Sequence, residues 1–281
     1  MTESMRGKTV VITGASAGIG AAAARAAAQA GASVIPIGRS PAKTAAIAEE
    51  LGADAHVVDF ADFASVRRLA DDLNSRVDRI DVFVHNAGAM IKNREVTVDG
   101  HERTIQTNYL GPFLLQLLIQ DHLRASGARV MVTSSVAHHV GVVRPRDLDG
   151  AGRRYSMINA YAASKLADLL FVRQLARLGT VAVGFDPGFV ATDFILPATG
   201  VGASDPETLR AVHRLGLKLL NVVQPDVAAA GILRFAAMDE PERLSGRLIS
   251  PTRPVRSSPA SHSSKLAGSL WTTTEAIVSR G

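Results

Sequence analysis

The sequence predicts one α/β domain, built on a doubly wound parallel sheet of about seven strands with helices on both faces. Short apolar runs alternate with longer helical patterns along the first two thirds of the chain. Each run is continuously apolar, which is typical of parallel strands buried on both faces. No linker divides the 281 residues, so we expect a single domain over 1–281.

The first half begins with an expected strand at 8–13, a glycine-rich turn at 14–20 and an alanine-rich helix at 19–30. The small side chains of this helix would let it lie close to the sheet. Pro41 suits a helix start, because the amide that proline lacks would be unpaired there anyway. Further strands are expected at 33–37, 55–58 and 80–84, and further helices at 41–51, 65–77 and 108–123.

The second half continues with a strand at 129–133, a long helix at 155–178 and a strand at 181–185. The rhythm then loosens, and we interpret 189–224 as a variable substrate-binding segment containing a short helix at 206–220. A helix is expected at 225–238 and a strand at 247–250. The remaining segment, 251–281, is predicted to form a C-terminal loop and helix. The surface loop would cover 251–264, and the helix at 265–278 would carry the single tryptophan, Trp271.

Composition excludes several classes of protein. Hydrophobic residues make up 47% of the chain, which is enough for a large core and excludes general disorder. The absence of cysteine excludes disulfides, a thiolate nucleophile and a cysteine metal site. The start of the chain is polar, unlike a signal peptide, and polar residues interrupt the apolar stretches. We therefore expect a cytoplasmic protein with no membrane span.

The net charge of +5 raises the question of nucleic-acid binding. The basic residues are scattered over helix faces and one loop, with few aromatic residues between them. This pattern indicates solvated surface, so we expect no nucleic-acid partner. His138 and His139 lie together, but no carboxylate or further histidine stands at ligand spacing, so we expect no metal and assign both to loop structure.

The glycine-rich turn is the first candidate binding site. It follows a strand and opens a helix, with the spacing GxxxGxG. Glycines allow a tight turn and close backbone approach, and a helix N-terminus stabilises a pyrophosphate. A purely structural turn is the alternative. The predicted cofactor contacts here are Gly14, Ser16, Ala17, Gly18, Ile19 and Gly20.

Two strand-end residues bear on the choice of cofactor. Arg39 ends the second strand, where NAD-specific sites place a carboxylate on the ribose 2′-hydroxyl; an arginine accommodates a 2′-phosphate and favours NADP over NAD. Asp59 ends the third strand and could accept a hydrogen bond from the adenine amino group. A surface arginine and an ordinary turn aspartate with no cofactor role would give the same sequence pattern at these two positions.

Tyr161 and Lys165 are four residues apart in the expected helix 155–178, so their side chains would share one face. A phenol with a pKa near ~10 is a poor acid or base at neutral pH, and a neighbouring cation lowers that pKa. Such pairs are also common on solvated helix faces, so this one is weak evidence when taken alone.

Considered with other motifs, the chain resembles the short-chain dehydrogenases/reductases over nearly its whole length, in particular the retinol-dehydrogenase-like branch, which is similar to protochlorophyllide-reductase-type proteins. The resemblance implies a Rossmann-type fold. The motifs are TGASAGIG at 13–20, His85 with Asn86, Ala87 and Gly88, then Asn108, Ser134 with Ser135, Tyr161 with Lys165, and Pro187 with Gly188.

The resemblance also implies roles for a tetrad of residues. Tyr161 would be the general acid in carbonyl reduction or the base in alcohol oxidation, and Lys165 would bind the nicotinamide ribose and lower the phenol pKa. Ser135 would hydrogen-bond the substrate oxygen. Asn108 would stabilise an irregularity in its helix and bind a water molecule that links Lys165 to solvent. Further cofactor contacts would be Asn86, Ala87, Gly88, Pro187, Gly188, Val190 and Thr192. Taken singly, Ser135 is also explained as a strand-end cap, Asn108 as a helix N-cap and 86–88 as a turn.

The sequence therefore predicts an NADP-dependent oxidoreductase acting on a small-molecule carbonyl or alcohol. Apolar residues over 194–223 favour a lipophilic substrate, although the same pattern would pack a helix on the core. The alternative is a non-catalytic NADP-binding regulator on the same fold, against which the intact tetrad argues. A homo-oligomer is compatible with the sequence. Asp186 departs from the branch, which usually has histidine there.

Overall fold

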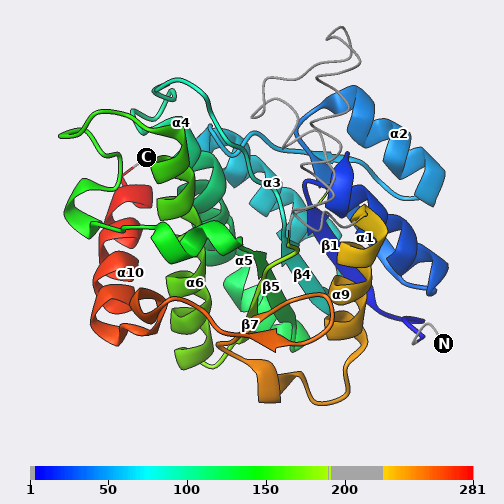
Figure 1. Ribbon diagram of the computed structural model, residues 1–281. Coiled ribbons are helices and arrows are strands. Elements are labelled where there is room, and N and C mark those ends of the chain that lie inside the picture. The colour runs from blue at the N-terminus through cyan, green and yellow to red at the C-terminus, as the bar shows by residue number, and fades with distance from the viewer. Residues whose placement is uncertain (1–3, 189, 191–223, 281) are drawn as a thin grey trace, which may run out of the picture.

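The computed structural model describes residues 4–188, 190 and 224–280. Within them, one eight-stranded sheet has the order β3-β2-β1-β4-β5-β6-β7-β8, and neighbouring strands are parallel except for the last pair (Figure 1). The strands are β1 (Thr9–Thr13), β2 (Ser33–Gly38), β3 (His56–Val57), β4 (Val82–His85), β5 (Arg129–Thr133), β6 (Val181–Phe185), β7 (Leu248–Ile249) and β8 (Pro254–Val255).

Helices cover both faces of the sheet, as the continuous apolar strands predict. On one face α1 and α9 pack together, with α2 beside α1; on the other lie α3, α5 and α6, with α10 packed against α6. The helices are α1 (Gly18–Gln29), α2 (Pro41–Leu51), α3 (Phe63–Arg76), α4 (Arg103–Ile105), α5 (Gly111–Ser126), α6 (Met157–Arg177), α9 (Pro225–Ala237) and α10 (Ser264–Val278).

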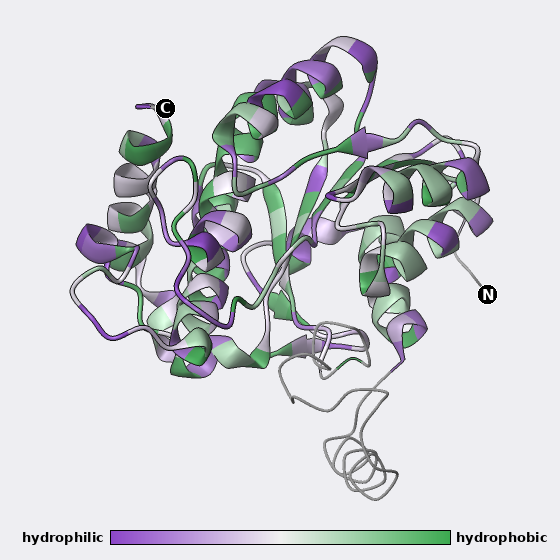
Figure 2. Ribbon diagram, turned by 90° about the horizontal axis from the view of Figure 1, so that it is seen from above, coloured by the Kyte–Doolittle hydropathy of each residue, from purple (hydrophilic) through white to green (hydrophobic). Residues whose placement is uncertain are grey.

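The core consists of two apolar layers, one on each side of the sheet. Side chains alternate along a strand, so Val11 of β1 enters one layer while Val10 and Ile12 enter the other. Figure 2 shows the central strands largely in the hydrophobic colour and hydrophilic residues on outer turns of the helices. Trp271 of α10 adds to the first layer, with its ring 4.8 Å from that of Phe113.

The doubly wound parallel fold is confirmed, with two differences of detail. The helix expected at 108–123 begins at Arg103 and passes through a π-helical turn, η1 (Gln106–Leu110), before α5. The loop expected at 251–264 holds β8, which turns back on β7 through a hydrogen bond from Ser250 N to Arg253 O of 2.8 Å. This hairpin raises the strand number from about seven to eight. The helix expected at 206–220 lies outside the described residues.

None of the described helices combines the length and the apolar character needed to cross a membrane.

Candidate active site

The strand order reverses between β1 and β4, which are hydrogen-bonded neighbours although β2 and β3 separate them in sequence. At such a switch point the loops leaving the two strands diverge, and a crevice opens at the carboxyl edge of the sheet. The glycine turn follows β1 and Asn86 follows β4. The topology therefore brings two of the predicted motifs to one crevice.

Asn86 joins three strands at this edge. The backbone amides of Asn86 and Ala87 donate to Thr13 Oγ1 at 2.9 and 3.0 Å, and Asn86 Nδ2 donates to Thr13 O at 3.1 Å. Thr133 Oγ1 at the end of β5 donates to Asn86 Oδ1 at 3.3 Å. The side chain thus fixes the spacing of β1, β4 and β5. Thr13 and Thr133 were not predicted as site residues, because a threonine at a strand end carries no distinct signal.

The glycine turn has the geometry of an anion site. Gly14 and Gly18 have φ of 68° and 54°, a left-handed conformation that favours glycine. The N-cap residue of α1, Ala17, gives no side-chain hydrogen bond, so the first amides of the helix lack a cap. Gly20 packs so closely that an added Cβ would lie 2.3 Å from Gly14 O. The uncapped positive end of α1 suits a phosphate.

The side chain of Ser16 from this turn lies beside the end of β2. A Cβ added at Gly38 would be 3.0 Å from Ser16 Oγ, and the exposed Arg39 directly follows Gly38. The turn and the predicted 2′-phosphate residue therefore meet at one edge. Asp59, at the end of β3, accepts a hydrogen bond from Ala61 N at 2.9 Å, as a turn aspartate does.

Lys165 projects from α6 to the carboxyl end of β5. Its Nζ donates to Thr133 O at 2.8 Å and to Asp168 Oδ2 at 2.9 Å, and both charged side chains are buried. A Cβ added at Gly88 would lie 3.6 Å from Lys165 Nζ and from Asn108 Oδ1. The predicted lysine, asparagine and glycine therefore surround one point in the crevice.

Asn108 is held within the π-helical turn. Its Oδ1 accepts from Ala89 N at 2.7 Å, and its Nδ2 donates to Ala89 O at 2.9 Å and to Ser164 Oγ at 3.0 Å. Ser164 Oγ donates in turn to Tyr161 O at 2.8 Å. The irregularity expected at Asn108 is present, and the explanation of Asn108 as a helix N-cap is wrong, since the helix begins upstream.

Tyr161 is buried one turn before Lys165, whose Nζ lies 5.7 Å from the centre of the phenol ring. Burial raises the pKa of Tyr161 above its ordinary value, while Lys165 and a hydrogen bond with the Ser135 side chain lower it. The effect of lysine is as expected, but desolvation of the phenolate is larger and raises the pKa of Tyr161 overall. Tyr161 is therefore a neutral phenol at neutral pH.

His138 links Ser135 to the C-terminal segment. Its Nδ1 contacts Ser135 O at 2.6 Å, and its Nε2 accepts from Ser258 N at 3.1 Å, so the imidazole is neutral with the proton on Nδ1. Burial lowers the pKa of His138. His139 stacks on it with ring centres 4.1 Å apart. The two hydrogen bonds support the loop-structural role expected for His138, whereas His139 is exposed.

The region after β6 is described in part. Asp186 N donates to Ile249 O at 2.8 Å, and Asp186 Oδ1 accepts from Gly188 N at 3.0 Å, which shapes the turn at Pro187. Val190 is buried on the α1 side of the sheet. Thr192 and nearly all of the segment 189–224 lie outside the described residues.

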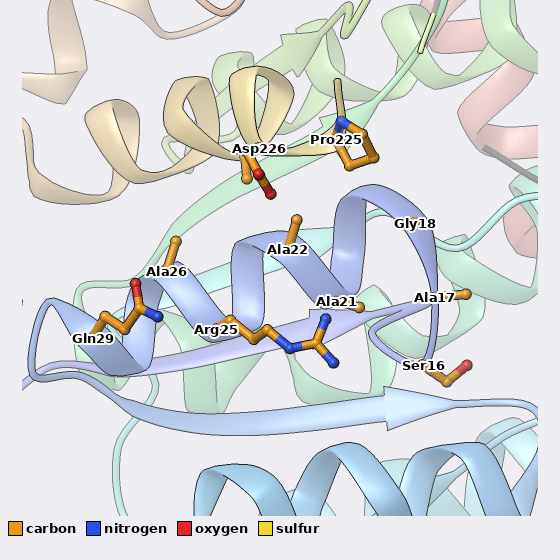
Figure 3. Close-up of a pocket in the computed structure, with 11 residues that line it drawn as sticks. Ser16, Ala17, Gly18, Ala21, Ala22, Arg25, Ala26, Gln29, Pro225 and Asp226 are labelled. Carbon is orange, nitrogen blue, oxygen red and sulfur yellow. The ribbon is translucent and has the colours of Figure 1, made fainter. Parts of the chain in front are cut away.

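A groove of about 560 Å³ runs along α1 and meets the glycine turn at Ser16, Ala17 and Gly18. Figure 3 shows Ala22 and Ala26 of α1 facing Asp226 of α9 across it. The lining does not include the tetrad, and the groove borders the strand-end site only at the glycine turn.

This geometry agrees with the family whose model matches the chain: residues 8–197 match the model described as short chain dehydrogenase. The chain belongs to this family. The retinol-dehydrogenase-like branch is also supported, since the chain is 33% identical to bovine (Bos taurus) retinol dehydrogenase 12, over 94% of this chain and 84% of that protein.

Two other relatives extend the comparison. The chain is 36% identical to mouse (Mus musculus) polyprenol dehydrogenase over 94% of itself and 82% of that protein. It is 41% identical to DnrU of Streptomyces sp. (strain C5), described as a daunorubicin C-13 ketoreductase, over 66% of itself and 67% of that protein.

Solved structures share the fold. A crystal structure from Mycobacterium paratuberculosis is 32% identical, with a TM-score of 0.76 over 99% of this chain and 96% of that chain. A structure from Beutenbergia cavernae, described as an NAD(P)-dependent gluconate 5-dehydrogenase with bound NADP, is 25% identical, with a TM-score of 0.69 over 89% of this chain and 97% of that chain. The protein is thus a member of an oxidoreductase family that binds nicotinamide cofactors.

Proposed function

We propose that this dehydrogenase transfers hydride between the nicotinamide of NADP(H) and a lipophilic carbonyl or alcohol. The observation that carries the proposal is the convergence of Lys165, Asn108 and Gly88 at the switch-point crevice, with Tyr161 one turn away. The glycine turn opens on the same crevice. One edge of the sheet therefore combines a place for a pyrophosphate with groups that handle a proton.

A bound nicotinamide would supply the hydride acceptor or donor at its C4 atom. The residues of this chain orient the reactants and move the proton. In the reduction direction, Tyr161 donates its phenol proton to the carbonyl oxygen, and Ser135, which hydrogen-bonds the phenol, holds that oxygen. Lys165 stabilises the resulting phenolate until it is reprotonated, and Asn108 fixes the backbone at Ala89 beside it.

The preference for NADP rests on the β2 edge. Ser16 and Arg39 flank Gly38 there, and neither is a carboxylate that would repel a 2′-phosphate. A guanidinium makes strong, paired hydrogen bonds to phosphate oxygens. The bound NADP in the Beutenbergia cavernae structure is compatible with this preference.

The lipophilic substrate is supported by two kinds of observation. The segment 194–223 is rich in leucine and other apolar residues. Relatives of this chain are named for polyprenol and retinol, both apolar alcohols, and DnrU for the reduction of a ketone. We therefore place the substrate among apolar alcohols and the carbonyl compounds they form.

The test is a screen for NADPH oxidation over apolar aldehydes, ketones and quinones. We expect turnover by the natural chain and its loss by about 100-fold or more in Tyr161→Phe, with NADP⁺ affinity nearly unchanged. Tyr155→Phe is the matched control, because the Tyr155 hydroxyl contacts Ile91 O at 2.6 Å, outside the tetrad. Turnover retained in Tyr161→Phe would refute the proton transfer. NADP⁺ binding with no turnover of any compound would favour the non-catalytic regulator instead.

A further inference from the structure

A buried carboxylate lies directly against the lysine of the proposed active site. Asp168 Oδ2 contacts Lys165 Nζ at 2.9 Å, and the side chains of Asp168 and Lys165 are 2% and 5% exposed. Residues three apart share a helix face, so α6 brings the two together without any other element. Burial of an ion pair costs more desolvation than its attraction commonly returns, so stability alone gives a weak reason for this aspartate.

Asp168 also acts on Tyr161. Three charged groups influence the phenol: Lys165 and Asp168 from α6, and Asp186 from the turn after β6. The lysine has the largest effect of the three and favours the phenolate, and the two carboxylates oppose it. Asp168 also acts on Tyr109 from η1, a neutral phenol whose pKa burial raises and whose hydroxyl contacts Thr274 Oγ1 at 3.0 Å. The buried His85 and His138 are neutral as well, since burial lowers the pKa of each.

We propose that Asp168 is a positioning residue that holds Lys165 against β5 and offsets its charge, so that Tyr161 remains a phenol and donates its proton in carbonyl reduction. The inference rests on the proposed function, and it assigns to Asp168 the alkaline limit of the reductive direction. Without Asp168, no carboxylate would contact Lys165, and the phenolate, the form needed to accept a proton in alcohol oxidation, would form at a lower pH.

The ionisation of the pair agrees with this role. Burial raises the pKa of Asp168 to about 6, against the opposing effect of Lys165, so the carboxylate is charged at neutral and alkaline pH. Burial lowers the pKa of Lys165, but Asp168 and Tyr161 together raise it above its ordinary value. Both charges are therefore present in the range where Tyr161 would begin to ionise.

The decisive experiment is a titration of Tyr161 by the near-ultraviolet absorbance of phenolate, in the whole protein without substrate. The chain has 3 tyrosines, so the signal of Tyr161 is taken as the difference between each variant and the same variant carrying Tyr161→Phe. Asp168→Asn keeps an oxygen for Lys165 but removes the charge. We expect the midpoint of Tyr161 to fall by about one pH unit.

Control variants separate this effect from structural damage. Asp168→Ser is a second neutral, hydrogen-bonding replacement, which serves if Asp168→Asn does not fold, and Asp168→Glu should restore a midpoint near that of the natural chain. Asp186→Asn removes a charge that acts on Tyr161 without touching Lys165, so its shift should be less than half as large. An unshifted midpoint in both neutral variants, or an equal shift in Asp186→Asn, would overturn the proposal.

Activity provides an independent readout. The alkaline limb of kcat/KM for carbonyl reduction should move to lower pH in Asp168→Asn by the same amount as the phenol midpoint. A merely structural aspartate would lower the melting temperature and leave the pH profile in place. If the natural chain turns over no carbonyl compound, the proposed function fails, whereas the phenolate titration still decides the role of Asp168.

Discussion

Gly20→Ala tests the cradle of the glycine turn with a single methyl group. A Cβ at this position would lie 2.3 Å from Gly14 O and 2.7 Å from Asn86 Nδ2. Neither neighbour can yield easily, because Gly14 is fixed in a left-handed turn and the Asn86 amide donates to Thr13 O. The methyl must therefore displace the turn or break the link between β1 and β4.

The size of the effect follows from opposing contributions. Alanine is more favourable than glycine in a helix by about 1 kcal/mol. Overpacking a rigid site costs about 1–3 kcal/mol, and loss of the Asn86 hydrogen bond about 1 kcal/mol more. We expect a net loss of about 1–3 kcal/mol in the free energy of unfolding, and a fall in NADP⁺ affinity of about tenfold or more as the amides leave their positions.

The free energy of unfolding is measured by denaturant unfolding followed by the fluorescence of Trp271, which packs on Phe113. The affinity is measured by titration with NADP⁺. Gly268→Ala is a control without a clash, since nothing lies within 4 Å of its added Cβ, and it should gain up to about 1 kcal/mol. Gly231→Ala is a control with a clash elsewhere, 2.5 Å from Pro251 Cα, and should lose stability but keep its affinity. The prediction would be refuted if Gly20→Ala bound NADP⁺ as tightly as the natural chain, or if Gly231→Ala lost as much NADP⁺ affinity as Gly20→Ala.

Three further outcomes are expected. Arg39→Asp should shift the preference from NADPH towards NADH by about tenfold or more, because a charged hydrogen bond to the 2′-phosphate becomes a repulsion; an unchanged ratio of kcat/KM values would contradict this. Burial lowers the pKa of His85 from 6.5 to about 4, so the unfolded chain takes up a proton first as the pH falls. The contribution of His85 to the free energy of unfolding should therefore drop by up to about 3 kcal/mol between pH 6.5 and 4. It is measured as the difference between the natural chain and His85→Phe in denaturant titrations at each pH, since Asp168, whose pKa is raised to about 6, changes the total in the opposite sense. His138→Ala leaves the Ser258 amide without its acceptor and should cost about 1–3 kcal/mol in thermal unfolding, whereas a cost near zero would mean that this contact does not hold the C-terminal segment.

The sequence predicts the fold because the signals it uses are local. A continuous apolar strand, a glycine turn and a small-residue helix can each be recognised from about a dozen neighbouring residues. Their alternation along the chain is compatible with only a few topologies. The helix of Tyr161 and Lys165 was placed within two residues at each end, at Met157–Arg177. The hairpin of β8 was missed, since a strand of two residues with a proline has no periodicity to detect.

By itself the sequence predicted the family, the succession of strands and helices along the chain and the strand-end side chains that would meet at one crevice, because strand ends and helix spacing are set by neighbours along the chain. Only the tertiary structure decided the electrostatics of Tyr161. Its pKa depends first on burial and then on the charges of Lys165, Asp168 and Asp186. Asp168 was open to prediction from its spacing, three residues after Lys165. Its importance follows from burial, because a buried carboxylate acts more strongly on the nearby phenol, the proposed proton donor, than the same ion pair would at the surface.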